Sequence, residues 1–434
     1  MSGQHDSFLD TLPVGWTFDR IKDVVSLRNE KTSEASEEED YLELEDLEAG
    51  TGRVLSRRNT LEVESAVTIF KRGDILFGKL RPYLEKYWAA EFDGKCTGEI
   101  LAFKPERIAS RFLFYCVGSR WFIQRCNALA YGAKMPRVSW PTQLAQFNVP
   151  LPPLQEQQRI VAYLDASCAM IDAAVAAKRR QLETLDGFVR TTINMAVTQG
   201  CDARTALIET DQDWFPSIPS GWQVVRFKSL FRVIYRYPTY FNIEYVPEGI
   251  PEVRGEALTP DGFIERLEDE RYISPETSSQ FPRTQLEVAD IVMSVRGTMG
   301  KIGLVDERYA GANITANMLR LSPNRTLVTG EFLRWLMRSA YFNEALNSSA
   351  PQTTIKTITM PQLAKLRVAL PPKNEQRAIC TFLDAKIAEI KRTAFVIDQQ
   401  VETLVAYRKS LIHECVTGQR RISEANLTWV KGRG

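Results

Sequence analysis

Two long stretches of the chain place apolar residues at alternating spacings of three and four, and each follows a Leu-Pro-Pro triplet. The first follows Leu151-Pro152-Pro153 and ends near Thr198; the second follows Leu370-Pro371-Pro372, 219 residues later. Apart from Gly187, neither stretch contains glycine or proline. Because proline is tolerated just before a helix or in its first turn, the pattern predicts two long helices.

The apolar spacing further predicts that these helices pair as a coiled coil. Lys178 and Arg408 interrupt the seam. At a rise of about 1.5 Å per residue, roughly 45 residues would extend about 65 Å, which is longer than most domains are wide. Two ordinary amphipathic core helices remain the alternative. The predicted seam consists of Leu164, Ile171, Leu182, Leu185, Leu383, Ile390, Ile397, Leu404 and Leu411.

The duplication includes the regions before the helices. A Gly-Trp pair at 15–16 recurs at 221–222, and an Asp-Ile pair at 74–75 recurs at 290–291. Short apolar runs with turn residues between them predict strands, two of which are residues 100–105 and 318–323. One short amphipathic helix is predicted after each, over 111–124 and 331–346. Each repeat is therefore predicted to be a mixed α+β globule followed by a long helix.

The predicted fold class is α+β, with two globular domains separated by two long antiparallel helices in a tandem repeat. The helices are antiparallel if the ends of the second globule lie close together. The tail is expected to return to the first domain, with Trp429 packing there as Trp214 packs against the second. The boundaries are 1–150 for the first domain, 151–200 for its helix, 201–369 for the second domain, 370–418 for its helix and 419–434 for the tail.

The amino-acid composition of the chain argues against several classes of function. The 434 residues carry a net charge of +1, so the chain is not a uniformly basic nucleic-acid binder, although local patches remain possible. Seven cysteines without a CxxC pair suggest reduced thiols in a cytoplasm. Only two histidines are present, which argues against histidine-based catalysis or metal binding. No uncharged apolar run approaches the length of a membrane span, and the N-terminus lacks the pattern of a signal peptide.

Basic and aromatic residues gather in predicted loops, whereas no nucleotide-binding, hydrolase or metal-site motif is present. Arginine and lysine suit phosphate contacts, and arginine can pair with guanine; a solvated charged turn is the plainer interpretation. The candidate DNA-binding residues are Arg53, Arg57, Arg58, Lys79, Arg81, Tyr83, Lys86, Lys134, Arg137, Arg296, Lys301, Gln352, Thr353 and Lys356.

Taken together, these features resemble the specificity subunit of type I restriction-modification systems. The resemblance rests on both Gly-Trp openings, both Asp-Ile strands, both helices and the junctions LPPLQEQQRI and LPPKNEQRAI, and it covers almost the full chain. The second junction departs from the first at Lys373-Asn374, where the first has Leu154-Gln155.

The resemblance implies a non-catalytic chain whose globules are target recognition domains, each reading half of a split site in double-stranded DNA. It also implies two modification (methyltransferase) subunits as partners, with restriction subunits as optional members of the complex. S-adenosylmethionine, ATP and Mg are expected on those partners, no cofactor or metal is expected on this chain, and its expected location is cytoplasmic. Two alternatives stay open: a coiled-coil scaffold that links protein-binding domains without binding DNA, and a recognition subunit for a stand-alone modification enzyme.

Overall fold

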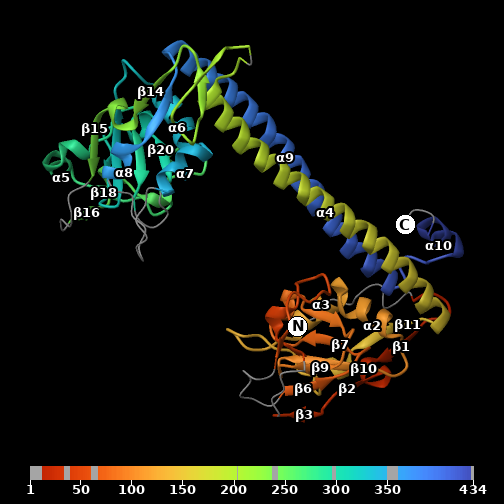
Figure 1. Cartoon of the computed structure of the whole chain (residues 1–434). Helices are drawn as coiled ribbons and strands as arrows, with labels where there is room; N and C mark the ends of the chain where they lie inside the picture. The colour runs from red at the N-terminus through yellow and green to blue at the C-terminus, as the bar shows by residue number, and fades with distance from the viewer. Residues whose placement is uncertain are drawn as a thin grey trace. The chain divides into compact units, whose positions relative to one another are not determined.

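The computed structural model describes residues 12–33, 40–59, 67–202, 204–236, 243–295, 300–348 and 360–431. The chain divides into two compact units (Figure 1). Unit 1 contains residues 1–179 and 398–434, and unit 2 contains residues 180–397. Each unit includes part of both long helices, because α4 spans Leu154–Gln199 and α9 spans Lys373–Val416.

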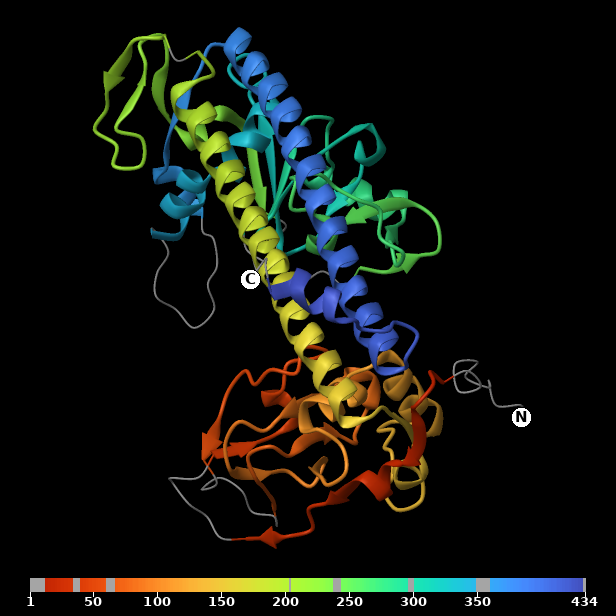
Figure 2. The same cartoon turned by 90° about the vertical axis from the view of Figure 1, so that its right-hand side faces the viewer.

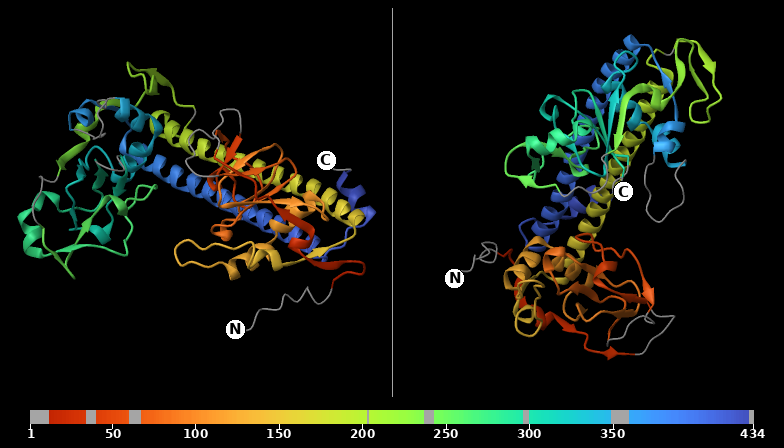
Figure 3. Two further views of the ribbon diagram at one scale, coloured as in Figure 1. Left: turned by 90° about the horizontal axis from the view of Figure 1, so that it is seen from below. Right: turned by 90° about the vertical axis from the view of Figure 1, so that its left-hand side faces the viewer.

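The two long helices pack together, and Figure 3 shows them side by side from two further directions. In unit 1 the start of α4 shares a core with the end of α9, through Leu164 and Leu411 among others. In unit 2 the end of α4 shares a core with the start of α9, through Val197 and Leu383. The helices are therefore antiparallel. By length and composition alone α4 could cross a membrane, but its buried apolar residues pack in these cores.

The predicted seam is buried most deeply near the helix ends. Leu164, Ile171, Leu383, Ile390 and Leu411 are buried, whereas Leu182, Leu185, Ile397 and Leu404 are half-buried. This gradient follows from packing, because the domain cores add cover only near the ends of the helices.

A four-stranded antiparallel sheet forms the centre of unit 1. Its order is β2 (Val25–Leu27), β10 (Ile100–Pro105), β7 (Ile75–Gly78) and β8 (Tyr87–Ala89). Ile75 and Phe77 belong to the core that contains α2 (Ser110–Val117), α3 (Arg120–Leu129) and α4, whereas Leu76 belongs to a second cluster. Because successive side chains of a strand point to opposite faces, β7 is apolar at consecutive positions.

That second cluster is covered by a five-stranded sheet of order β3-β6-β9-β4-β5. Strand β1 pairs with β11 directly before α4, so the start of the domain is joined to the start of the helix. The bounds are β1 Thr17–Arg20, α1 Ile21–Val24, β3 Lys31–Thr32, β4 Asp40–Leu42, β5 Arg58–Asn59, β6 Val67–Phe70, β9 Gly94–Cys96 and β11 Asn148–Leu151.

Unit 2 repeats this plan. Its central sheet has the order β15-β22-β19-β20, a second sheet has the order β16-β18-β17-β21, and β14 pairs with β23 directly before α9. The predicted strand 318–323 is β22, as 100–105 is β10. The bounds are β12 Leu207–Glu209, β13 Ser217–Pro219, β14 Gln223–Arg226, β15 Phe231–Arg236, β16 Tyr245–Val246, β17 Ile250–Val253, β18 Tyr272–Ile273, α5 Pro275–Gln280, β19 Ile291–Ser294, β20 Ile302–Leu304, β21 Asn313–Ile314, β22 Met318–Pro323, α8 Met360–Lys365 and β23 Arg367–Leu370.

The prediction of a single helix over 111–124 and another over 331–346 is wrong, because two helices occupy each of these regions. Unit 1 has α2 and α3, and unit 2 has α6 (Gly330–Arg338) and α7 (Ala340–Ser348). A serine begins the second helix in both units. The Ser119 hydroxyl accepts the N–H of Phe122 at 3.4 Å, and the Ser339 hydroxyl accepts that of Phe342 at 3.3 Å. Such a side-chain cap favours a new helix start.

The Gln that both Leu-Pro-Pro junctions share ties the long helix to its domain. Gln157 accepts the N–H of Ala109 at 2.8 Å and donates to the carbonyl of Pro152 at 2.9 Å. Gln376 accepts the N–H of Thr329 at 3.0 Å and donates to the carbonyls of Leu327 and Pro371 at 2.8 and 2.9 Å. Both glutamines are buried, so each satisfies backbone groups at the start of a domain helix and of a long helix.

The C-terminal segment packs on unit 1. Helix α10 (Glu424–Lys431) follows α9 and is drawn across α4 in Figure 2. Glu424, its first residue, lies 4.0 Å from Arg159 in the second turn of α4. Ile422 is buried in the core that contains Trp16, Leu427 packs against that core, and Arg421 pairs with Glu156 at 3.1 Å. The side chain of Trp429 lies outside the described residues. The matching expectation for Trp214 is wrong: Trp214 is 41% exposed, and the neighbouring Phe215 is buried against Tyr341 instead.

Candidate nucleic-acid interface

Two loops of unit 1 that the sequence suggested separately form one surface, here called the loop pair: residues 79–86 and 131–137. The N–H of Arg81 donates to the carbonyl of Pro136 at 2.7 Å, and the N–H of Val138 donates to that of Lys79 at 3.0 Å. Within the second loop, Tyr131 and Arg137 exchange two backbone hydrogen bonds. The loop pair therefore extends from the end of β7 as a joined structure.

Several candidate residues of the loop pair remain open to a ligand. Tyr83 is 53% exposed, Lys134 is exposed and Lys79 is half-buried. Among the described residues, neither lysine has an ion-pair partner. Arg81 donates to the carbonyl of Lys134 at 3.5 Å, which holds its guanidinium beside the second loop. These cations could meet phosphate groups without first breaking a salt bridge.

Other candidates are engaged within unit 1. Arg53 pairs with Asp172 of α4 at 3.0 Å, and Lys86 is bonded to the Leu47 carbonyl. Arg57 pairs with Asp40 at 3.3 Å and lies over the Phe92 ring. Their roles in binding DNA stay predictions, since Arg53 and Arg57 also keep more than half of their side chains exposed.

Arg58 and Arg137 are held by carboxylates. Arg58 bonds Asp46 at 3.1 Å and Glu43 at 2.8 Å, and the bond to Asp46 raises the pKa of Arg58. Arg137 bonds Glu99 at 3.0 Å, which raises the pKa of Arg137. Arg137 therefore holds the second loop of the pair against Glu99, and Arg58 holds the turn that contains Glu43 and Asp46.

In the second domain, Lys301 is the one candidate residue that lies within the described part of the chain. Lys301 is half-buried, and its carbonyl accepts the N–H of Ser294 at the end of β19 at 2.9 Å. Arg296, Gln352, Thr353 and Lys356 lie outside the described residues. The predicted loop of unit 2 therefore stays a prediction.

Sequence reasoning missed a buried carboxylate directly before β7 and another directly before β19, the strands that lead to the candidate loops. Asp74 and Asp290 precede β7 and β19, and their side chains are almost fully buried. Arg28 donates to Asp74 at 2.9 Å, and Arg320 of β22 donates to Asp290 at 2.7 Å. The paired Asp-Ile motif was visible in the sequence, but Arg28 follows β2 whereas Arg320 lies in β22, so no common spacing indicates the arginines.

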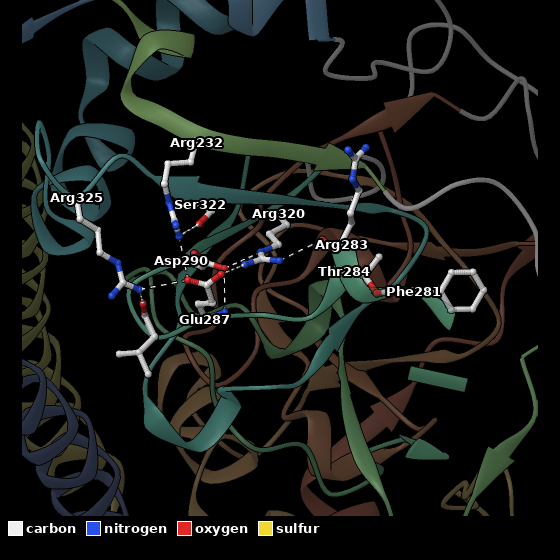
Figure 4. A network of polar contacts seen from close by, with 10 residues as sticks. Arg232, Phe281, Arg283, Thr284, Glu287, Asp290, Arg320, Ser322 and Arg325 are labelled. Carbon is white, nitrogen blue, oxygen red and sulfur yellow. Dashed lines mark hydrogen bonds and ion pairs between the residues drawn. The ribbon is translucent and has the colours of Figure 1, made fainter. Parts of the chain in front are cut away.

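In unit 2 the buried carboxylate lies in a wider network (Figure 4). Arg320 also donates to Glu287 at 3.0 Å, and Arg232 donates to Glu287 at 2.9 Å and to the Ser322 hydroxyl at 3.2 Å. Arg325 lies 3.8 Å from Glu287. The network fixes the start of β19, the strand that leads to the candidate loop of the second domain.

The described residues contain no group of three or more His, Cys, Asp and Glu side chains that could hold a metal ion. The described residues form a hydrogen-bonded, partly cationic surface in unit 1, on an α+β domain whose central sheet order recurs in unit 2.

A model of the type I restriction modification DNA specificity domain matches residues 13–184 and 219–403. The chain belongs to this family. The finding confirms the predicted family, and with it the prediction that the chain is a DNA specificity subunit and not a catalytic one.

Comparisons with individual proteins support this family assignment. The chain is 25% identical over 312 residues to the EcoBI specificity subunit of Escherichia coli, a match that covers 70% of this chain and 63% of that protein's length. A chain from a structure on complex assembly and conformational transition of the type I R-M system matches with a TM-score of 0.73 at 19% identity, covering 94% of this chain and all of that one. The HsdS subunit from Thermoanaerobacter tengcongensis matches with a TM-score of 0.54 at 20% identity, covering 94% and 98%. At these identities the two structures support the fold, including two β-rich domains and paired helices.

Proposed function

We propose that this specificity subunit reads a bipartite, asymmetric site in double-stranded DNA, one half with each β-rich domain. The observation that carries the proposal is the repeat itself: both domains share the order of the central sheet and the glutamine junction. The sequences that follow the equivalent strands differ, with Lys-Leu-Arg-Pro-Tyr at 79–83 and Val-Arg-Gly-Thr-Met at 295–299. Similar scaffolds with different loops suit two different half-sites.

The loop pair is the candidate contact surface of the first domain. Lys79 and Lys134 supply positive charge, and Arg81 and Tyr83 supply groups able to contact phosphates or base edges. The corresponding role of Arg296 and Lys301 in the second domain belongs to the same proposal.

The paired helices are proposed to dock two methyltransferase subunits, with restriction subunits joining in a restricting complex. S-adenosylmethionine, ATP and Mg would then belong to those partners, in the cytoplasm where host DNA is available. The support is a set of large apolar side chains that the helices leave exposed, since such exposure commonly marks protein contacts. They are Phe188 and Met195 on α4, and Phe382, Phe395, Val396, Val405 and Tyr407 on α9.

Mobility-shift assays with the chain alone and with an added modification subunit separate the candidate functions. The proposal predicts a shift that depends on DNA sequence when the modification subunit is present. A scaffold without DNA-binding function would give no sequence-dependent shift in either condition, and a recognition subunit for a stand-alone enzyme would form no stable complex with modification subunits.

The docking proposal has its own test. Phe395 is 65% exposed, so Phe395→Ser should leave the thermal stability of the chain unchanged. If the side chain is central to the contact, its loss costs about 2 kcal/mol or more of binding free energy, about 30-fold in Kd. Arg377→Ala on an exposed turn of the same helix is the control. Full retention of the modification subunit by the Phe395 variant would place the contact elsewhere.

A further inference from the structure

At the tip of the loop pair, two residues adopt backbone dihedral angles that are energetically unfavourable for their residue types. Arg81 and Glu85 have φ values of +50° and +52°, and they bracket the short turn η4 (Pro82–Leu84). This left-handed conformation is unfavourable for residues other than glycine. Strain of this kind persists only where surrounding structure imposes it, and it gathers at functional sites. The backbone therefore presents Tyr83 and Leu84 in one fixed conformation.

The base of the tip is held from two sides. Arg81 is bonded through its N–H to Pro136, and Pro82 is buried. On the other side, the N–H of Gly50 donates to the carbonyl of Glu85 at 2.9 Å, and Lys409 of α9 donates to both oxygens of the Glu85 carboxylate at 2.8 and 2.9 Å. A tip anchored in this way loses little further conformational entropy when it binds a ligand.

The tip exposes apolar surface where water would normally favour polar groups. Tyr83 is 53% and Leu84 36% exposed. The second loop adds Tyr131 at 61% and Met135 at 42%, and α3, which packs beside η4, ends at the 41% exposed Leu129. An exposed apolar cluster marks a binding surface.

The charges around the cluster favour DNA over a protein as its ligand. Lys79 and Lys134 lack ion-pair partners within the described part of the chain, and lysine is depleted in the apolar centres of protein interfaces. The acidic side chains beside the loop pair are neutralised, Glu85 by Lys409 and Glu99 by Arg137. Phosphate groups could therefore approach without meeting an unpaired carboxylate there.

We infer that Tyr83 and Leu84 form a wedge that enters the DNA at a base step of the first half-site and separates the two stacked base pairs. The inference rests on the proposed function and adds a mode of binding to it. Apolar wedges flanked by cations kink duplexes in this way, and an aromatic ring can stack on the exposed base. An opened step would also favour the extrusion of a nearby base by a methyltransferase.

The experiment uses the full chain with its modification subunits and duplexes that carry 2-aminopurine at successive positions of the first half-site. The wild-type complex should raise 2-aminopurine fluorescence at one step, because unstacking relieves quenching. Tyr83→Ala and Leu84→Ala should abolish that rise. Loss of one base-stacking contact should also weaken specific binding by about 5-fold to 150-fold in the Tyr83 variant, with binding to unrelated DNA retained. Tyr83→Phe keeps the ring and should behave as wild type, and Trp214→Ala, at an exposed aromatic residue of unit 2, controls for aromatic loss elsewhere.

Tight specific binding by the wild type without any rise in fluorescence would overturn the wedge and leave the proposed function standing. A rise that persists in both alanine variants would assign the unstacking to other residues and overturn it as well. Normal unstacking with weakened association of the modification subunits in those variants would make the tip a protein contact instead. Absence of any sequence-specific binding by the wild type would instead refute the proposed function.

Discussion

Replacing Gln376 by leucine should destabilise unit 2 more than any exposed substitution on the same helix. The leucine side chain fills similar space but removes three hydrogen bonds, to Thr329, Leu327 and Pro371. A polar group left unsatisfied in the interior costs about 1–3 kcal/mol. The bond to Pro371 is buried, and the bonds to Thr329 and Leu327 are partly buried. A total loss of about 3–5 kcal/mol of unfolding free energy is therefore expected.

The repeat provides an internal comparison. Gln157 makes two such bonds, so Gln157→Leu should cost about 2–4 kcal/mol, and its effect should appear in unit 1. Denaturant unfolding gives the total, and hydrogen exchange at the amides of Ala109 and Thr329 gives the location. Arg377→Ala is the matched control, since Arg377 is exposed beside Gln376. A loss below about 1 kcal/mol for Gln376→Leu, or equal loss of protection at both amides, would refute the role assigned to the junction.

Three further changes test other parts of the structure. Ala289 has a φ of +68° at the position where the first repeat has Gly73. Ala289→Gly should therefore stabilise unit 2 by about 1 kcal/mol, and Gly73→Ala should destabilise unit 1 by a similar amount. Thermal denaturation measures both effects, and an unchanged melting temperature for Ala289→Gly would contradict the prediction. Asp172→Ala should cost about 2–3 kcal/mol because it leaves the mostly buried Arg408 unpaired, and adding Arg408→Met should restore most of that loss in a double-mutant cycle. Lys134→Gln should weaken binding to all DNA sequences and lower the slope of log K against log salt concentration by about one; an unchanged slope would place Lys134 away from the phosphates.

The sequence predicted the features that depend on local periodicity. The spacing of apolar residues gave both long helices, and the strands at 100–105 and 318–323 match β10 and β22. The duplication could be read because both junctions keep the same residues at the same offset. Arg408, expected to interrupt the seam, does so, but Asp172 of the facing helix pairs with it at 3.0 Å. That pairing depends on helix register, which composition does not reveal.

The features that the sequence did not predict depend on contacts between distant residues. The loop at 79–86 joins the loop at 131–137 through backbone hydrogen bonds, which leave no pattern in the side chains. The breaks between α2 and α3 and between α6 and α7 depend on single serine caps within otherwise helical patterns. Basic side chains held by internal partners, such as Arg58 and Arg137, could not be told from free ones, because the same residue types serve both purposes.

The central claim is that two different domains of one chain read the two halves of one DNA site. Methylome sequencing of a host that carries the modification subunits, with and without this chain, tests it most directly. The account predicts methylated adenines that appear only with the chain, within a bipartite motif of two different half-sites around an unread centre. Exchanging residues 79–86 and 131–137 for the loops of another specificity subunit should alter one half-site and leave the other unchanged. A methylome that does not depend on the chain, or a loop exchange that alters both half-sites together, would contradict the account.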